Sequence, residues 1–493
     1  MNQVGKEINN TKILFLRPTS KTTFAVSPPF SAGYLAASLK KEGFNDLRFI
    51  DGTLHQYSPH DVLELLKDDV HDFICIQVYS GSHQWVKKFI ELLHSNNIFS
   101  HTIVGGPHIS ALKETAMEHL NADYGIIGEG EEVLPQLIHT IINHREDNFN
   151  DIHGLIYKKN NEYKISRIPF AKVEDINSIP IPLWKLLEPD KYFESMRTGS
   201  ATIPPKGSRI VNILTSRGCP YNCTFCASGI TLQKKIRYRN VENIIQELEY
   251  LKNTYNIDEF WLTDDNFTMN IERAADFCNL LIEKKLKLHW RAPNGLRIDR
   301  LTEELIRKMK ESGCYSVGLG VETGSPVIMK KIKKNLDLAK VGEILKIFRE
   351  NKILTSGFFI VGLPFEKEKD IEQTIDFALK SKFDRIQVSI FIPYPGSEEF
   401  ENVFEKNVSE EKYLKHVNEY LYKCKMPEIN KNLSNDRIRS LQKKMLTKFY
   451  FRPEIILSII LNLRLNKISG MLKHPVVKRW FNKDPDIFIK DVE

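Results

Sequence analysis

The stretch SRGCPYNCTFC, residues 216–226, places Cys219, Cys223 and Cys226 within eight positions of a chain that has only seven cysteines in 493 residues. So few cysteines do not make a disulfide framework, and a cluster of them in a cytosolic protein indicates metal binding or catalysis. A disulfide would also leave one of the three sulfurs over. A structural zinc site closes with four ligands, commonly as two pairs. No second Cys-x-x-Cys pair and no Cys–His pair follows here.

Three thiolates suit a different metal group. A four-iron cluster is normally held by one cysteine thiolate per iron, so three cysteines leave one iron without a protein sulfur. An open coordination position is a feature of catalytic metals, whereas structural metals are fully ligated by the chain. The spacing therefore predicts a 4Fe-4S cluster with one iron open to a small molecule. Phe225 lies between two of the cysteines, and we expect its ring to shield the cluster from water.

The region that contains the cysteines alternates short apolar runs with helical segments, beginning at residue 209. Such runs, separated by amphipathic helices, indicate parallel strands. Six of them predict a parallel, barrel-like sheet, with the cysteines just after its first strand, where barrel active sites are built. The six expected strands are residues 209–216, 259–264, 287–292, 315–322, 355–362 and 385–391.

Cys-x3-Cys-x2-Cys after a first barrel strand resembles the signature of the radical S-adenosylmethionine enzymes. The resemblance implies a partial (β/α)6 barrel of the TIM type, in which the open iron chelates the amino and carboxylate groups of S-adenosylmethionine. One electron, from a donor such as flavodoxin or ferredoxin, would then cleave the sulfonium to a 5′-deoxyadenosyl radical that removes a hydrogen atom from a small-molecule substrate. Residues 392–400, IPYPGSEEF, are similar to the segment that ends this barrel. The cofactor supplies the chemistry, and the protein binds, orients and shields.

Later strand ends carry residues that suit the same site. Glu322 ends an apolar strand, and a carboxylate in such surroundings is usually paired or functional. Gly362 would let the backbone approach an adenosyl group closely. For Asp264 and its neighbour Asp265 the alternative role is to cap the helix that begins near Asn270. Together with the resemblance, these features predict contacts to S-adenosylmethionine from Phe225, Asp264, Glu322 and Gly362.

The N-terminal part of the chain shows the same alternation. Its apolar runs and amphipathic helical stretches predict a doubly wound, Rossmann-like α/β domain over residues 10–145. Residues 146–208 follow as a linker region with a hairpin and proline-rich connections, in which helix and central strand are disfavoured. The barrel would then occupy residues 209–400 and a helical region residues 401–493. The expected N-terminal strands are residues 12–16, 46–51, 73–80, 101–106 and 124–130.

Three segments of the N-terminal domain, residues 28–44, 104–108 and 125–135, resemble the cobalamin-binding domain of cobalamin-dependent radical S-adenosylmethionine enzymes. Glycines at strand ends let a large cofactor lie against the backbone at the crevice of such a sheet, and serines there would hydrogen-bond its nucleotide tail. The alternative is that the glycines only make strand–helix turns. The resemblance implies cobalamin contacts from Ser80, Ser82, Gly105, Gly106, His108 and Gly128.

Cobalamin domains that ligate cobalt through histidine carry Asp-x-His-x-x-Gly, and this motif is absent from the sequence. We therefore expect cobalt to have no histidine beneath it, and we expect His108 in GGPH to contact the loop or the nucleotide tail. A cobalt without that ligand would transfer a methyl group to a carbon radical more readily, in agreement with the usual chemistry of the family.

The composition is that of an ordinary globular protein, with 42% apolar residues, 27% charged residues and a net charge of +7. No long basic tract or aromatic-and-arginine array is present, so we do not expect nucleic acid as a partner. The N-terminus lacks an apolar core with a cleavage site, which favours the cytoplasm. Apolar residues at helical spacing near the C-terminus predict a helical cap on the barrel. Peripheral membrane contact, or a lipid-like substrate, is the alternative for the basic, apolar segment 447–475.

With the resemblance, these features predict a cobalamin-dependent radical enzyme of the methyltransferase type that methylates an unactivated carbon. A cyclase or rearrangement enzyme of the same family is one alternative, and a non-catalytic sensor of cobalamin or the cluster is another. Methylthiotransferases need three further cysteines in the N-terminal domain, where this chain has only Cys75. We expect no second cluster, because Cys278, Cys314 and Cys424 are far apart in the sequence and are typical of buried thiols.

Overall fold

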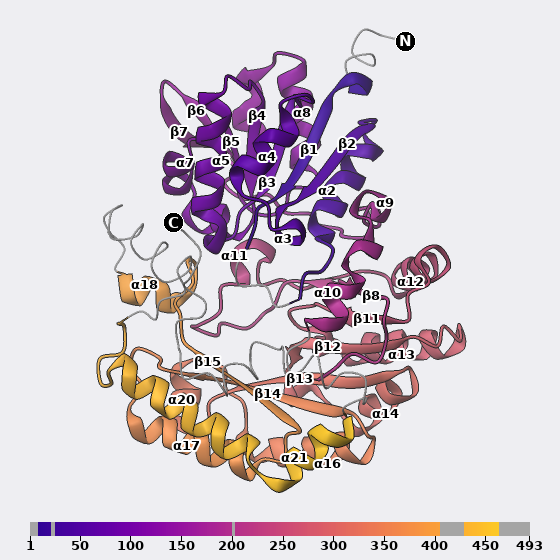
Figure 1. The fold of residues 1–493 in the computed structure, drawn as a ribbon, viewed down its shortest axis with the longest axis vertical. Helices are drawn as coiled ribbons and strands as arrows, with labels where there is room; N and C mark the ends of the chain where they lie inside the picture. Colours follow the sequence, from indigo (N-terminus) through magenta and orange to yellow (C-terminus); the bar gives the residue numbers. More distant parts are fainter. Residues whose placement is uncertain (1–7, 21–24, 200–202, 405–427, 463–493) are drawn as a thin grey trace. The chain divides into compact units, whose positions relative to one another are not determined.

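The computed structural model describes residues 8–20, 25–199, 203–404 and 428–462 (Figure 1). Contacts between residues divide the chain into two compact units. The first comprises Met1–Tyr192, Leu214–Leu251 and Pro393–Cys424, and the second comprises Phe193–Ile213, Lys252–Ile392 and Lys425–Glu493. Each unit is built around one large sheet. The division into four parts that we expect from the sequence stays a prediction.

The sheet of the first unit has five parallel strands in the order β2-β1-β3-β4-β5, extended by the antiparallel strands β6 and β7. This order confirms the predicted doubly wound α/β fold. The predicted hairpin is also present, and its turn residues Asn160 and Asn161 have φ of 53° and 62°, as a two-residue hairpin turn requires. The strands are β1 (Lys12–Arg17), β2 (Asp46–Asp51), β3 (Phe73–Gln77), β4 (His101–Gly105), β5 (Tyr124–Ile126), β6 (Leu155–Lys159) and β7 (Glu162–Ile165).

Helices cover both faces of this sheet, because its strands are apolar on both sides (Figure 1). In β1, Leu14 and Leu16 point into a core shared with α4, α5 and α7, whereas Ile13 and Phe15 point into a core shared with α2 and α8. This alternation follows from the two-residue period of a strand. The helices are α2 (Phe30–Lys41), α3 (Gly52–His55), α4 (Pro59–Leu66), α5 (His83–Ser95), α6 (Pro107–Leu112), α7 (Glu114–Leu120), α8 (Val133–Ile142) and α9 (Trp184–Leu187).

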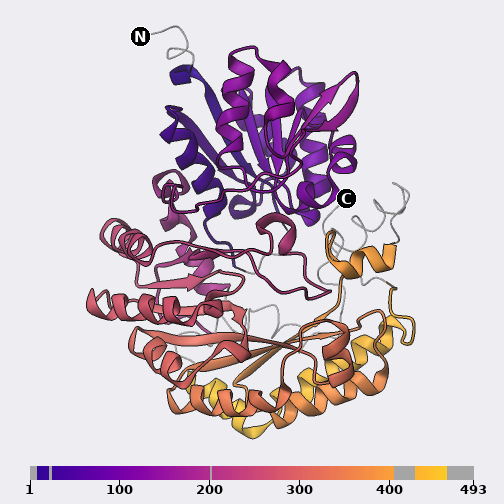
Figure 2. The ribbon, with the colours of Figure 1, turned by 180° about the vertical axis from the view of Figure 1, so that it is seen from behind.

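The sheet of the second unit has six parallel strands in the order β8-β11-β12-β13-β14-β15, which confirms the predicted partial barrel (Figure 2). The first strand is shorter than we expect from the sequence, since it ends at Ile213. The strands are β8 (Ile210–Ile213), β11 (Glu259–Leu262), β12 (His289–Leu296), β13 (Cys314–Glu322), β14 (Leu354–Val361) and β15 (Arg385–Ile390). The connecting helices are α12 (Val241–Tyr255), α13 (Ile271–Glu283), α14 (Glu303–Glu311), α15 (Pro326–Lys331), α16 (Leu338–Glu350) and α17 (Glu368–Lys380).

The predicted helical cap is present as α20 (Asn435–Tyr450) and α21 (Pro453–Asn462). Helix α20 packs along the edge strand β15, where the Gln442 amide and the Tyr450 hydroxyl each donate to a backbone carbonyl at 2.7 Å. These contacts satisfy groups that an open edge would leave unpaired. The part of the segment 447–475 beyond residue 462 lies outside the described residues. Among the helices that the structure describes, none has the length and apolar character needed to cross a membrane.

Candidate functional site

The three clustered cysteines lie on a loop, residues 218–236, that we call the cluster loop. It belongs to the first unit and is closed by the antiparallel pair β9 (Ser216–Arg217) and β10 (Arg237–Tyr238). Gly218 starts the loop with a φ of 96°, and a Cβ there would lie 2.7 Å from the Lys235 carbonyl oxygen. Only glycine fits both this conformation and this close approach.

The sulfurs of the cluster loop differ from the other described sulfurs in their access to solvent. Cys219 and Cys223 are half-buried and Cys226 is exposed, whereas Cys75, Cys278 and Cys314 are buried. Burial raises the pKa of each of these three buried thiols. Thiolates bind iron, so the accessible set is the one that suits a metal. Cys424 lies outside the described residues.

The three sulfurs do not converge on one point. Within the described ranges, no three His, Cys, Asp or Glu side chains are gathered as a site for a single metal ion. A cubane cluster does not need such convergence, because each thiolate binds a different iron. Three accessible thiols on one short loop are donors of the kind that a cubane cluster takes. The Ser228 N–H lies 3.5 Å from Cys226 Sγ, so a backbone donor reaches this sulfur.

The segment that follows β15 packs on the cluster loop. The Glu399 N–H donates to the Thr224 carbonyl at 3.0 Å, between the second and third cysteines. Gly396 has a φ of 90° and lies so close to Ile230 that a Cβ would be 1.3 Å from Ile230 Cδ1. These contacts hold the middle of the loop from outside. Phe225, between Thr224 and the third cysteine, is half-buried, and its shielding role stays a prediction.

The predicted cobalamin contacts lie together at the carboxyl ends of β3, β4 and β5. Gly106 has a φ of 102°, and a Cβ there would be 3.1 Å from the Val78 carbonyl oxygen. Gly128 has a φ of 96°, and a Cβ would be 2.2 Å from the Ala171 carbonyl oxygen. The chain's own packing thus demands these two glycines. At Gly105 a Cβ would meet nothing closer than 3.8 Å, so its missing side chain leaves bare backbone that suits a flat cofactor.

His108 is committed to hydrogen bonds within the chain. Its Nδ1 lies 3.0 Å from Ser80 Oγ, and its Nε2 lies 2.8 Å from His83 Nδ1. Burial lowers the pKa of both imidazoles, that of His83 to about 3, so the pair is neutral at pH 7. Ser82 has a different task, because its hydroxyl donates to the Tyr79 carbonyl and accepts the Tyr79 N–H, which fixes the turn after β3.

In the second unit, the predicted S-adenosylmethionine contacts follow β11, β13 and β14. Asp264 is buried two residues beyond the end of β11. The alternative reading of Asp264 and Asp265 as a helix cap is wrong. Asn270 caps α13 instead, since its side chain accepts the Arg273 N–H at 2.8 Å. The role of Asp264 toward the cofactor stays a prediction.

Glu322 ends β13 in a strained conformation, with a φ of 71° at a β-bulge. Its Oε1 lies 2.6 Å from Nζ of Lys334, and both side chains are buried. Gly320 makes room for the pair, because a Cβ there would lie 2.7 Å from both charged groups. Strained backbone of this kind collects at functional sites. Sequence reasoning missed Lys334, which is one of five lysines between residues 330 and 340 and shows no local signal.

Gly362 follows β14 in a turn and has a φ of 85°. This turn is supported by Glu366, a second residue that sequence reasoning missed. Glu366 is fully buried, and its Oε2 accepts the Gly362 N–H at 2.6 Å and the Leu363 N–H at 3.2 Å. Burial raises the pKa of Glu366 to about 7 against the effect of these two donors. The signal that would have found it is the acidic residue in VGLPFE, four positions after the glycine.

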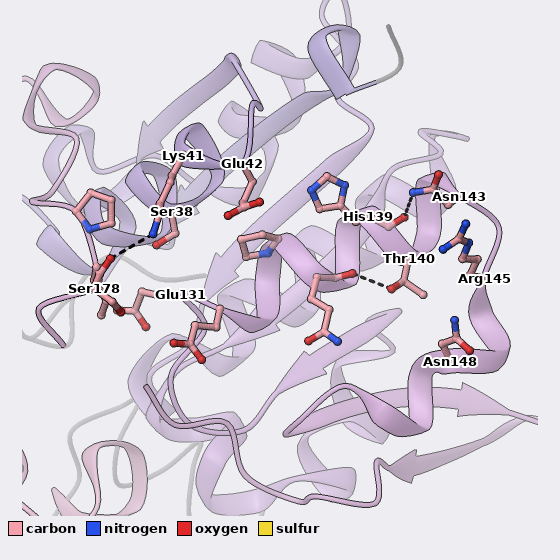
Figure 3. Close-up of a pocket in the computed structure, with 15 residues that line it drawn as sticks. Ser38, Lys41, Glu42, Glu131, His139, Thr140, Asn143, Arg145, Asn148 and Ser178 are labelled. Carbon is pink, nitrogen blue, oxygen red and sulfur yellow. Dashed lines mark hydrogen bonds between the residues drawn. The ribbon is translucent and has the colours of Figure 1, made fainter. Parts of the chain in front are cut away.

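A separate cavity of about 470 Å³ opens in the first unit between the end of α2 and helix α8 (Figure 3). Its lining includes both signs of charge, namely Lys41 and Arg145 as well as Glu42, Glu131 and Glu132. None of the predicted cofactor residues lines it, so we do not assign it to the cofactor site.

Comparison with known proteins agrees with this geometry. Residues 213–378 match the family described as "Radical SAM superfamily", and residues 21–138 match "B12 binding domain". The chain belongs to the cobalamin-dependent radical S-adenosylmethionine enzymes. Its cofactors are a 4Fe-4S cluster, S-adenosylmethionine and cobalamin, and it acts on a small-molecule substrate with the help of a reductant.

The chain matches curated relatives over most of its length, and two of them are methyltransferases. The chain is 30% identical over 456 residues to "Uncharacterized methyltransferase PH0819" of Pyrococcus horikoshii, covering 91% of this chain and 94% of that protein. It is 26% identical over 436 residues to cytidylyl-2-hydroxyethylphosphonate methyltransferase of Streptomyces wedmorensis, covering 79% and 80%. The fold is that of the methyltransferase TsrM from Kitasatospora setae, solved with cobalamin and a [4Fe-4S] cluster, at a TM-score of 0.66, 15% identity and coverage of 93% and 90%.

Proposed function

We propose that this enzyme methylates an unactivated carbon of a small-molecule or lipid-like substrate. The observation that carries the proposal is the hydrogen bonding of His108, whose two ring nitrogens both bond within the chain. A histidine held in this way would have to break one of these bonds to ligate cobalt. Cobalt without a protein nitrogen beneath it suits methyl transfer to a carbon radical. The names of the two relatives, both methyltransferases, support the same reaction class.

Residues of the cluster loop would hold the metal group. Cys219, Cys223 and Cys226 are the proposed ligands, with one iron left open. When bound, the cluster and S-adenosylmethionine supply a 5′-deoxyadenosyl radical, and cobalamin carries the methyl group. The chain contributes shielding and orientation. Phe225 would limit access of water, and the bond from Glu399 to Thr224 holds the loop between its second and third ligands.

The strand ends of the second sheet would bind the aminoacyl and ribose parts of S-adenosylmethionine. We assign contacts to Asp264, Glu322 and Gly362, as the sequence predicts. Lys334 adds a buried cation beside Glu322. A buried pair of opposite charges matches a zwitterion, because the ammonium and carboxylate of the ligand each find a partner.

The strand ends of the first sheet would bind cobalamin. Bare backbone at Gly105 and Gly106 would lie against the corrin, and the Ser80 hydroxyl, oriented by His108, would face the nucleotide tail. Ser82 and Gly128 shape this edge from within, by fixing turns. Flavodoxin or ferredoxin is the proposed electron donor, and the cytoplasm is the proposed location.

The test uses the anaerobically reconstituted protein with S-adenosylmethionine that carries a CD3 group. We expect release of S-adenosylhomocysteine, recovery of the label on the cobalamin, and 5′-deoxyadenosine under reduction. The cob(II)alamin electron paramagnetic resonance spectrum should lack the nitrogen splitting of a histidine ligand. A protein that forms 5′-deoxyadenosine but never moves the methyl label is not a methyltransferase.

A cyclase is the second candidate. The chain is 25% identical over 383 residues to "Anaerobic magnesium-protoporphyrin IX monomethyl ester cyclase" of Cereibacter sphaeroides, covering 76% of this chain and 60% of that protein. A cyclase consumes S-adenosylmethionine without placing its methyl group on a product. The label experiment therefore separates the two candidates before the substrate is known.

A further inference from the structure

Four buried charged side chains of the first unit form one network at the base of the cluster loop. Arg217 donates through Nη1 to Glu129 Oε1 at 2.8 Å and through Nη2 to Glu131 Oε1 at 2.7 Å. Arg237 donates to the second oxygen of Glu129. All four side chains are at most 8% exposed. Neither the sequence analysis nor the proposed chemistry gives these residues a role.

The two arginines hold matching positions on the two strands that close the cluster loop. Arg217 in β9 and Arg237 in β10 are directly paired partners, one just before the loop and one just after it. Glu129 comes from the loop after β5, beside Gly128, and also accepts the Val173 N–H at 3.0 Å. Its carboxylate therefore joins both ends of the cluster loop to the edge of the first sheet.

This arrangement is needed because the ladder itself is short. Strands β9 and β10 have two residues each, and a pair of that length is not stable on its own. A charge-assisted bond from Arg to a carboxylate is directional and, when buried, fixes geometry. One carboxylate that binds both strands sets their separation, and with it the span over which the three cysteines must reach the cluster.

We propose that Glu129 is a positioning residue that holds the two ends of the cluster loop in register by bridging Arg217 and Arg237. Iron affinity and the environment of the cluster then depend on a carboxylate of the first sheet. Glu131 is also buried, with its side chain 8% exposed against 2% for Glu129, and in the described part of the chain it pairs with Arg217 and not with Arg237, so it supports one end of the loop and offers a control. The inference rests on the cluster assignment to Cys219, Cys223 and Cys226 but not on methyl transfer.

The test compares Glu129→Gln with Glu131→Gln in the full chain, each reconstituted anaerobically with iron and sulfide. We expect Glu129→Gln to weaken iron retention against a chelator about ten-fold, in the range known for groups that orient metal ligands. The spectrum of the reduced cluster, and its change on adding S-adenosylmethionine, should also differ from wild type. Glu131→Gln should keep wild-type iron retention and a wild-type spectrum.

A merely structural role predicts a different outcome. In that case both variants lose thermal stability together, and the cluster spectrum of the folded fraction stays that of wild type, which overturns the proposal. If Glu129→Gln does not fold, Arg237→Lys replaces it, since this change keeps the charge but loses the fork that also reaches the Val173 and Leu232 carbonyls. A wild-type spectrum and wild-type iron retention in Arg237→Lys would overturn the proposal equally. Wild-type protein that binds no iron would instead refute the cluster assignment.

Discussion

The two parallel sheets place their predicted site residues at the same kind of position, the carboxyl ends of strands, but with opposite chemistry. At the ends of β3 and β4 the first sheet presents glycine backbone, a serine hydroxyl and two neutral histidines, which we call the neutral edge, whereas the charged residues Glu129 and Glu131 follow β5. The edge of the second sheet presents a buried aspartate, a strained glutamate paired with lysine, and a glutamate with a raised pKa. The fold sets where a site lies, and the side chains at the strand ends set which cofactor it suits. A neutral edge suits a broad corrin, and a charged edge suits the zwitterionic end of S-adenosylmethionine.

The largest effect that we expect comes from the cluster loop, which carries the proposed iron ligands. Changing any one of Cys219, Cys223 or Cys226 to Ala should reduce cluster iron from about four per chain to near zero, because only three thiolates hold the cluster and the loss of one leaves two irons without a protein ligand. Iron and acid-labile sulfide analysis measures this loss. Cys278→Ala, at a buried thiol, is the control and should cost stability while leaving iron in place. Full iron in any of the three loop variants would show that the ligand assignment is wrong.

The next largest effect is expected at the charged edge, the strand ends of the second sheet. Lys334→Met leaves Glu322 buried without its partner and removes the cation proposed for the ligand carboxylate, so S-adenosylmethionine affinity should fall at least about ten-fold. Equilibrium dialysis with the cluster-loaded protein measures the affinity. Lys333→Met, at an exposed neighbouring position, should bind as wild type does. If both variants bind S-adenosylmethionine with equal affinity, the charged residues at this edge do not belong to the cofactor site.

The neutral edge should respond mainly through its backbone. Gly106→Ala forces a Cβ into a φ of 102° and against the Val78 carbonyl, so it should lower the free energy of unfolding by about 1–2 kcal/mol and weaken cobalamin binding. Gly105→Ala meets no such contact. It should unfold as wild type does and still weaken cobalamin binding if the corrin lies on this backbone. If Gly105→Ala binds cobalamin as tightly as wild type does, the corrin does not lie on this backbone.

The smallest effect on the cofactor sites is expected from Glu366, which we test through the pH dependence of stability alone. Its pKa is raised to about 7 in the folded chain, so the folded state holds a proton that the unfolded state has released. The free energy of unfolding should therefore fall as pH rises from about 4.5 to 7, by on the order of 3 kcal/mol, and stay low above pH 7. Urea unfolding of the cofactor-free protein at several pH values measures the slope. Glu366→Gln should flatten it, and an unchanged slope would assign the dependence to other groups.

Sequence patterns were sufficient for the two sheets and for the glycines at their strand ends, but not for Lys334 and Glu366. The two-residue and 3.6-residue periods predicted both sheets and the helical cap, because strand and helix surfaces follow from local spacing. The spacing of three cysteines predicted the cluster loop. Gly106, Gly128 and Gly362 were found as glycines at strand ends, and all three have positive φ in the structure.

The sequence by itself thus determined the fold class, the order of the strands along the chain and the type of metal group. Only the tertiary structure decided which charges meet. Arg217 and Glu129 are 88 positions apart, and Arg237 and Glu129 are 108 positions apart, so no local period links them. Lys334 meets Glu322 at the bulge that ends β13, and His108 meets Ser80 and His83 because β3 and β4 are neighbours. Buried polar groups must find partners, and which partner each finds depends on which strand ends the fold brings together.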